Sequence, residues 1–257
     1  MKRPRKADIV GWWVTAVLFA FIAALLFPIV ATKRTGGPDS CLSYEFQLGL
    51  AILQYAEDYN IRMPIGVDGK GAGWAGIVLP YIKSTDVFHC PDDATTATTP
   101  DVPISYAYNE NIARAGGSFL KAADPKAMVL VFEVAGDYAD LSKPDEGSKA
   151  GTAPLSASGD GTDGSLHAGS LTGIVYATGY LGKRPHASTA TQFTSPTGRH
   201  TDGANYMLGD GHVRWLMGNN ASSGLSAIHP KDFQTGGIVG RAAGTENGEF
   251  QATFSTR

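Results

Sequence analysis

The longest apolar run of the chain covers residues 9–32 and contains no charged side chain. As an α-helix rising about 1.5 Å per residue, it would be roughly 36 Å long, more than the ~30 Å hydrocarbon core of a bilayer. A signal-peptide core is shorter and ends at a small-residue cleavage site, whereas this run continues directly into Lys33 and Arg34. The pattern therefore predicts a transmembrane helix over residues 9–32.

Basic residues are more frequent before this run than after it. Residues 1–8 contain four of them, and two follow at positions 33 and 34. Because positive charge is retained on the cytoplasmic side, the pattern predicts an amino end in the cytoplasm. We therefore expect a single pass through the inner (cytoplasmic) membrane, a cytoplasmic basic segment 1–8, a linker 33–40 and a periplasmic or extracellular head 41–257.

A second helix is predicted over residues 41–59, after the break at Gly36, Gly37 and Pro38. Apolar or small residues recur there at spacings of three and four, which is typical of an amphipathic helix. These residues are Leu42, Phe46, Gly49, Leu53 and Ala56. An apolar helix face needs a covering layer, so we expect a β-sheet from residues 60–257.

Several short runs in residues 60–257 have the composition of β-strands. The strongest is 127–134, a nearly continuous apolar segment suited to the centre of a sheet. Weaker candidates are residues 105–108, 173–181, 204–208 and 212–217. Together the runs predict an α+β fold with an N-terminal transmembrane helix and a second amphipathic helix packed on an antiparallel β-sheet.

The last two of these runs flank Asp210 and Gly211, and Asp-Gly between alternating segments favours a β-hairpin. Asp-Gly suits a two-residue type I′ loop, which needs a positive φ at both central residues. We therefore interpret Asp210 and Gly211 as a structural turn. His200, ten positions before Asp210, is expected to hydrogen-bond the turn or a neighbouring backbone group.

The composition narrows the functional classes. The formal charge is −3, and no basic stripe lies outside the first six residues, so nucleic acid is not an expected partner. The two cysteines, Cys41 and Cys90, fall in the segment predicted to be exported, where disulfides persist. We therefore predict a disulfide between them, with two unrelated small hydrophobic residues as the alternative.

Metal sites are weaker interpretations. A hairpin would bring together two His and two Asp residues able to bind zinc, namely His200, Asp202, Asp210 and His212. The loop at Asp160 and Asp163 is rich in oxygen ligands, but it lacks the bidentate Glu of an EF-hand calcium loop. We prefer a turn for the first set and a solvated glycine loop for the second, so no cofactor is expected, with calcium as the weaker possibility.

Sequence motifs for catalysis are missing. The chain contains no Gly-x-Ser-x-Gly, His-Glu-x-x-His or P-loop pattern. Glu133 ends the apolar run 127–134, but the sequence offers no acid partner for it. We therefore do not expect an enzyme.

Four segments in order resemble the type IV prepilin-like and type II secretion pseudopilin-like proteins whose head ends in a His, nine residues, then Asp-Gly. They are residues 25–28 at the end of the apolar run, 41–59, the Cys-Pro and Tyr-Asn stretches at 87–93 and 105–109, and Arg199-His200 followed by Asp210-Gly211. The resemblance implies a pilin-like fold. It also implies a structural subunit that contacts itself or other pilin-like subunits through its N-terminal helix.

The chain departs from type IV prepilins at the cleavage site. Aligned on Pro28, Lys6 stands at the expected Gly and Gly11 at the expected Glu. The first functional hypothesis is a pilin-like or pseudopilin-like membrane-anchored subunit of a type IV pilus-like or type II secretion-like filament. The alternative is an unprocessed single-pass membrane protein with a ligand- or ion-binding head that does not polymerise.

Overall fold

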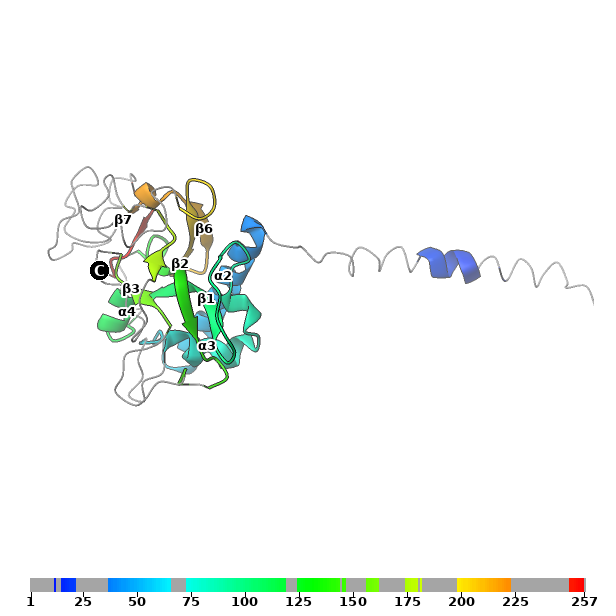
Figure 1. Cartoon of the computed structure of the whole chain (residues 1–257), viewed down its shortest axis with the longest axis horizontal. Helices are drawn as coiled ribbons and strands as arrows, with labels where there is room; N and C mark the ends of the chain where they lie inside the picture. Colours follow the sequence, from blue (N-terminus) through cyan, green and yellow to red (C-terminus); the bar gives the residue numbers. More distant parts are fainter. Residues whose placement is uncertain are drawn as a thin grey trace, which may run out of the picture. The chain divides into compact units, whose positions relative to one another are not determined.

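A computed structural model describes eleven parts of the chain (Figure 1). They are residues 12, 15–21, 37–65, 73–118, 124–143, 145–146, 156–161, 174–179, 181, 198–222 and 250–256. The chain divides into two compact units, Met1–Gly36 and Gly37–Arg257. This division is close to the predicted boundary between linker and head.

The first unit corrects the prediction of a membrane span. Trp12 and residues 15–21 are helical and exposed, and the rest of the predicted span 9–32 lies outside the described residues. None of the helices in the described part of the chain combines the length and apolar composition that a membrane crossing requires. The predicted transmembrane helix and single-pass inner-membrane location are therefore wrong.

The second unit is a mixed α+β head. Its helical elements are α2 (Pro38–Asp58), α3 (Trp74–Ile82), η1 (Asp86–Phe88), α4 (Glu110–Arg114) and η4 (Gly218–Asn220). Its strands are β1 (Val102–Asn109), β2 (Val129–Ala139), β3 (Ser158–Gly159), β4 (Val175–Tyr176), β5 (Ala204–Leu208), β6 (Val213–Leu216), β7 (Ala221–Ser222) and β8 (Ala252–Thr253).

Six strands form one sheet with β2 at its centre. The order is β3-β1-β2-β5-β6, and β4 pairs with the middle of β2, at Val134 and Ala135. All neighbours are antiparallel except β3, which runs parallel to β1. The first six residues of β2 are buried, which agrees with the apolar run predicted for a central strand. The last strands, β7 and β8, form a separate parallel pair.

Helix α2 packs against one face of this sheet, but its buried face differs from the predicted one. Phe46 was expected on the apolar face and is 42% exposed, whereas Glu45 has no exposed surface. Leu48 and Ile52 continue the buried side. Gly49 faces Met207 of β5 so closely that an added Cβ would lie 1.8 Å from the Met207 Cε. The helix therefore presents a small residue and a carboxylate to the sheet at its closest approach.

Candidate functional site

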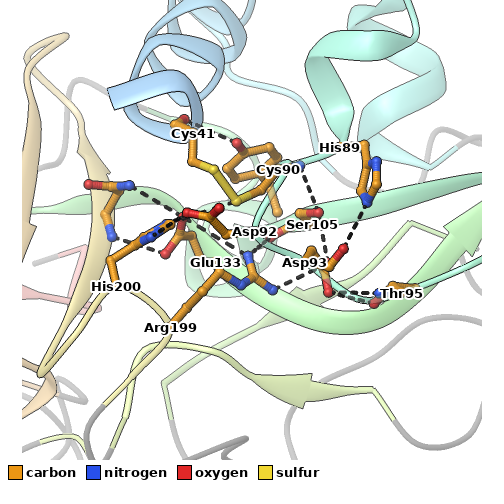
Figure 2. The surroundings of a disulfide bond; sticks show 12 residues. Cys41, His89, Cys90, Asp92, Asp93, Thr95, Ser105, Glu133, Arg199 and His200 are labelled. Carbon is orange, nitrogen blue, oxygen red and sulfur yellow. Dashed lines mark hydrogen bonds and ion pairs between the residues drawn. A yellow bond between two sulfur atoms is a disulfide. The ribbon is translucent and has the colours of Figure 1, made fainter. Parts of the chain in front are cut away.

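A disulfide links the first turn of α2 to the loop after η1 (Figure 2). Cys41 and Cys90 are both fully buried, and their Cα atoms are 4.9 Å apart. This is the pairing predicted from the sequence. The Tyr106 hydroxyl of β1 donates a hydrogen bond to the Cys41 carbonyl at 3.0 Å, so the sheet supports the helix at the same place.

Asp93 organises the loop that contains Cys90. Its Oδ2 accepts a hydrogen bond from the Ser105 hydroxyl at 2.7 Å, and the Ser105 oxygen in turn accepts the Cys90 N–H at 2.9 Å. Its Oδ1 accepts the Thr95 N–H and hydroxyl at 3.1 and 2.7 Å. The loop is thereby fixed to β1 beside the disulfide (Figure 2).

The second half of the site is a buried ionic network around Glu133 of β2. Glu133 Oε1 lies 2.8 Å from His200 Nε2, and Asn205 donates to the same carboxylate from its backbone N–H at 3.1 Å. The Arg199 side chain is only 7% exposed, and its Nη2 lies 3.2 Å from Asp93 Oδ2. Arg199 Nη2 also donates to the Val134 carbonyl. Each buried charge therefore has a partner, as buried ions require.

His200 joins this network to the disulfide loop. Its Nδ1 lies 3.3 Å from Asp92 Oδ2, and its Nε2 lies 3.9 Å from the Cys90 sulfur. The His200 carbonyl accepts the Trp215 indole N–H of β6 at 3.0 Å. His200 thus connects β2, β6 and the Cys90 loop, and Figure 2 shows its ring directed between Glu133 and the disulfide.

The hairpin turn lies at the opposite end of β5 from His200. Leu208 and His212 close a three-residue loop, because the Leu208 N–H donates to the His212 carbonyl and the Gly211 N–H donates to the Leu208 carbonyl. Among the loop residues, Gly211 has a positive φ of 95° and Asp210 does not have a positive φ. The turn is therefore a three-residue loop with glycine in the left-handed region, not the predicted two-residue type I′ loop.

Asp210 stabilises this turn locally. Its Oδ1 accepts the His212 N–H at 3.1 Å, and its Oδ2 lies 2.9 Å from His212 Nδ1. The side-chain contacts of His200 are instead with Glu133 and Asp92. The nine residues between His200 and Asp210 therefore span one strand, with the His anchored before the strand and the turn after it.

Replacing Gly211 by Val is expected to cost more than about 1 kcal/mol of unfolding free energy, because a β-branched residue is strained at positive φ. Steric crowding does not explain this loss, since the nearest atom to an added Cβ is Leu53 Cδ1 at 3.5 Å. Asn adopts the left-handed region more readily, so Gly211→Asn should lose less. Urea denaturation of both variants measures the difference, and equal losses would contradict the assigned strain.

The structure separates the metal ligands proposed from the sequence. Within the described residues, the metal-compatible group that includes His200 contains Cys41, Cys90 and Asp92, and it omits Asp202, Asp210 and His212. Of the predicted calcium loop, Asp160 pairs with Arg114 at 2.9 Å. The other member, Asp163, lies outside the described residues.

Glu45 belongs to the site, although it is not among the residues predicted to form the apolar face of its helix. Its Oε1 accepts the Met207 N–H of β5 at 2.9 Å, and its Oε2 is buried without a hydrogen-bond partner among the described residues. Burial, and then the nearby Glu133 carboxylate, raise the pKa of Glu45 well above its ordinary value. The protonated form of Glu45 is therefore favoured in the folded head.

This raised pKa predicts that Glu45→Gln gains stability relative to the wild type as the pH rises. Above about pH 4.3 the unfolded chain releases the Glu45 proton, whereas the folded head retains it up to its higher pKa. Ionisation therefore favours the unfolded state of the wild type between these two pKa values, and Gln removes that effect while keeping an acceptor for Met207. Denaturation of both proteins at about pH 4 and about pH 7 measures the difference in unfolding free energy between Glu45→Gln and the wild type.

The exposed Glu57→Gln is the control, and its difference from the wild type should not change with pH. A pH-independent difference for Glu45→Gln would contradict the raised pKa.

A second pair of buried carboxylates lies beside α3. Glu146 accepts the Gly76 N–H at 2.6 Å and the Ser156 N–H at 2.7 Å, so it caps the start of α3 from a distant segment. Asp137 of β2 accepts the Ala157 N–H at 2.8 Å, and burial raises its pKa. Both side chains are fully buried and bind backbone amides, which is typical of structural carboxylates.

No protein-family model matches this chain, and neither a curated protein nor a solved structure matches it.

Proposed function

We propose that this chain is a pilin-like structural subunit whose apolar N-terminal helix packs against other copies of itself in a filament-like assembly. The observation that carries the proposal is the exposure of large apolar side chains in the first unit. They are 59% to 80% exposed in the single chain, and they are Trp12, Val17, Leu18, Phe19 and Phe21.

The distribution of these side chains around the helix supports packing on several sides. At about 100° per residue, Val17, Leu18 and Phe19 point in three different directions, and Phe21 returns close to Val17. A helix that is apolar all round is normally buried by neighbours, because exposed apolar surface is unfavourable in water. Several copies of the same helix would supply those neighbours.

The head supports a structural role more than a catalytic one. The carboxylates of the central network are buried, and Glu133 and Asp93 accept hydrogen bonds from the protein itself. The disulfide ties α2 to the Cys90 loop, and Asp93 fixes that loop to β1. A head fixed in this way suits the surface of an assembly, where its shape must persist between subunits.

The proposal is tested by introducing charge into the exposed helix. The full-length wild type should sediment as a high-order assembly in aqueous buffer, and electron microscopy should show its form. The double variant Phe19→Glu with Phe21→Glu should sediment as a monomer, because assembly would bury two carboxylates at each helix contact.

Leu50→Glu is the matched control, since Leu50 is 48% exposed on α2 of the head. This variant should assemble like the wild type. A monomeric wild type would overturn the proposal. So would a double variant that assembles as the wild type does, or loss of assembly from Leu50→Glu alone.

A further inference from the structure

We propose that the head binds one zinc ion when the Cys41–Cys90 disulfide is reduced, through Cys41, Cys90, His200 and Asp92. The ligand atoms of these four side chains all lie within 4.8 Å of one another. Two thiolates, one imidazole and one carboxylate are a donor set that zinc accepts in tetrahedral coordination. The reduced, zinc-bound form is therefore a second chemical state of the site shown in Figure 2.

The oxidised head does not offer this donor set, because each sulfur is bonded to the other. A phosphine reductant, together with one water molecule, converts the disulfide into two thiols and itself becomes the phosphine oxide. Zinc then replaces the two thiol protons, which are released to solvent. Zn–S bonds of about 2.3 Å place two tetrahedral sulfur ligands roughly 3.8 Å apart, which is close to a non-bonded sulfur contact.

The third ligand already faces the sulfurs. His200 Nε2 lies 3.9 Å from the Cys90 sulfur, while Nδ1 faces Asp92 Oδ2 at 3.3 Å. Binding through Nε2 takes His200 from Glu133. Glu133 keeps the Asn205 backbone and side-chain donors, at 3.1 and 3.3 Å, so its carboxylate is not left without hydrogen bonds.

Asp92 supplies a route to the ion as well as a ligand. Its side chain is 37% exposed, whereas that of His200 is 2% exposed and both cysteines are fully buried. An ion can therefore meet the Asp92 carboxylate first and reach the buried donors from there. The exposed Asp92 carboxylate therefore gives the cluster the entry path that a protein metal site needs.

The experiment uses the full chain, reduced with a phosphine and desalted without oxygen, and titrated with Zn²⁺ against a chromophoric chelator. The reduced chain should bind one equivalent, and the oxidised chain should bind at least 10-fold more weakly. Co²⁺ in place of zinc should give a thiolate-to-cobalt charge-transfer band in the near ultraviolet. Equal binding by the two redox states, or no such band, would overturn the proposal.

Variants locate the site. Cys41→Ser and the more exposed Asp92→Asn should each weaken zinc binding by the reduced chain at least 10-fold. Because Asp92 is partly exposed, Asp92→Asn should fold even where a cysteine variant does not. The pair His212→Ala with Asp210→Ala removes the surface His–Asp contact at the hairpin and should leave binding unchanged. Binding lost with that pair and retained in Asp92→Asn would place the zinc at the hairpin and overturn the proposal.

Discussion

Glu133→Ala is expected to destabilise the head by about 3–5 kcal/mol, because it removes one partner from a buried ionic network. Glu133 has no exposed surface and lies 2.8 Å from His200 Nε2. Without it, the imidazole and the two donors of Asn205 lose their shared acceptor, and a cavity remains in the sheet. Urea denaturation followed by circular dichroism measures the loss.

Glu57→Ala is the matched control, since Glu57 is exposed on α2. An exposed substitution of this kind is expected to change stability by no more than about 0.5 kcal/mol. Glu133→Gln keeps the shape and one acceptor, so it should fall between the two. If Glu133→Ala were as stable as Glu57→Ala, the network would not hold the head together.

The second large effect is expected from the disulfide. Replacing both Cys41 and Cys90 by Ala should lower the unfolding free energy by about 4 kcal/mol, because the unfolded chain loses a closed loop. The two residues are 49 positions apart in the sequence. Thermal or urea denaturation of the double variant and of the reduced wild type should give similar losses. A double variant as stable as the oxidised wild type would refute the expected contribution.

His200 has a different role from the support of the hairpin turn that the sequence predicted. If His200 only supported the hairpin turn, His200→Ala would cost less unfolding free energy than Gly211→Val. The structure places His200 between Glu133 and Asp92 with a side-chain exposure of 2%. A fully buried network is more sensitive to loss of a member than a half-buried turn is, so we now expect the larger loss from His200→Ala.

Local sequence patterns predicted the elements that depend on local periodicity. The helix expected at 41–59 is α2, Pro38–Asp58, and the central strand expected at 127–134 overlaps β2, Val129–Ala139. The hairpin of β5 and β6 was also predicted, although its loop is one residue longer. Periodicity reports which residues alternate between core and solvent, and that information is contained in a short segment.

The same patterns failed where burial depends on a distant partner. Glu45 was not among the residues predicted for the apolar face of its helix, yet it is buried, and the Met207 N–H, 162 positions away, offsets part of the cost of that burial. The burial of Glu133 could have been inferred from the continuous apolar run that contains it, because a buried carboxylate requires hydrogen-bond donors. The sequence does not show that His200 and Asn205 supply them. The apolar run at 9–32 met the length criterion for a membrane span, but none of the described helices is long and apolar enough to cross a membrane.

The position of the disulfide also has a mechanical consequence. The second unit begins at Gly37, and Cys41 lies four residues further along the chain. Tension applied through the N-terminal unit would therefore reach a covalent cross-link before it could peel the remaining turns of α2 from the sheet. The load would pass from Cys41 to Cys90 and into the loop that Asp93 fixes to β1. The oxidised head should resist pulling from its amino end through a covalent bond, whereas the reduced head must resist it through side-chain packing and hydrogen bonds such as that from Tyr106 to the Cys41 carbonyl.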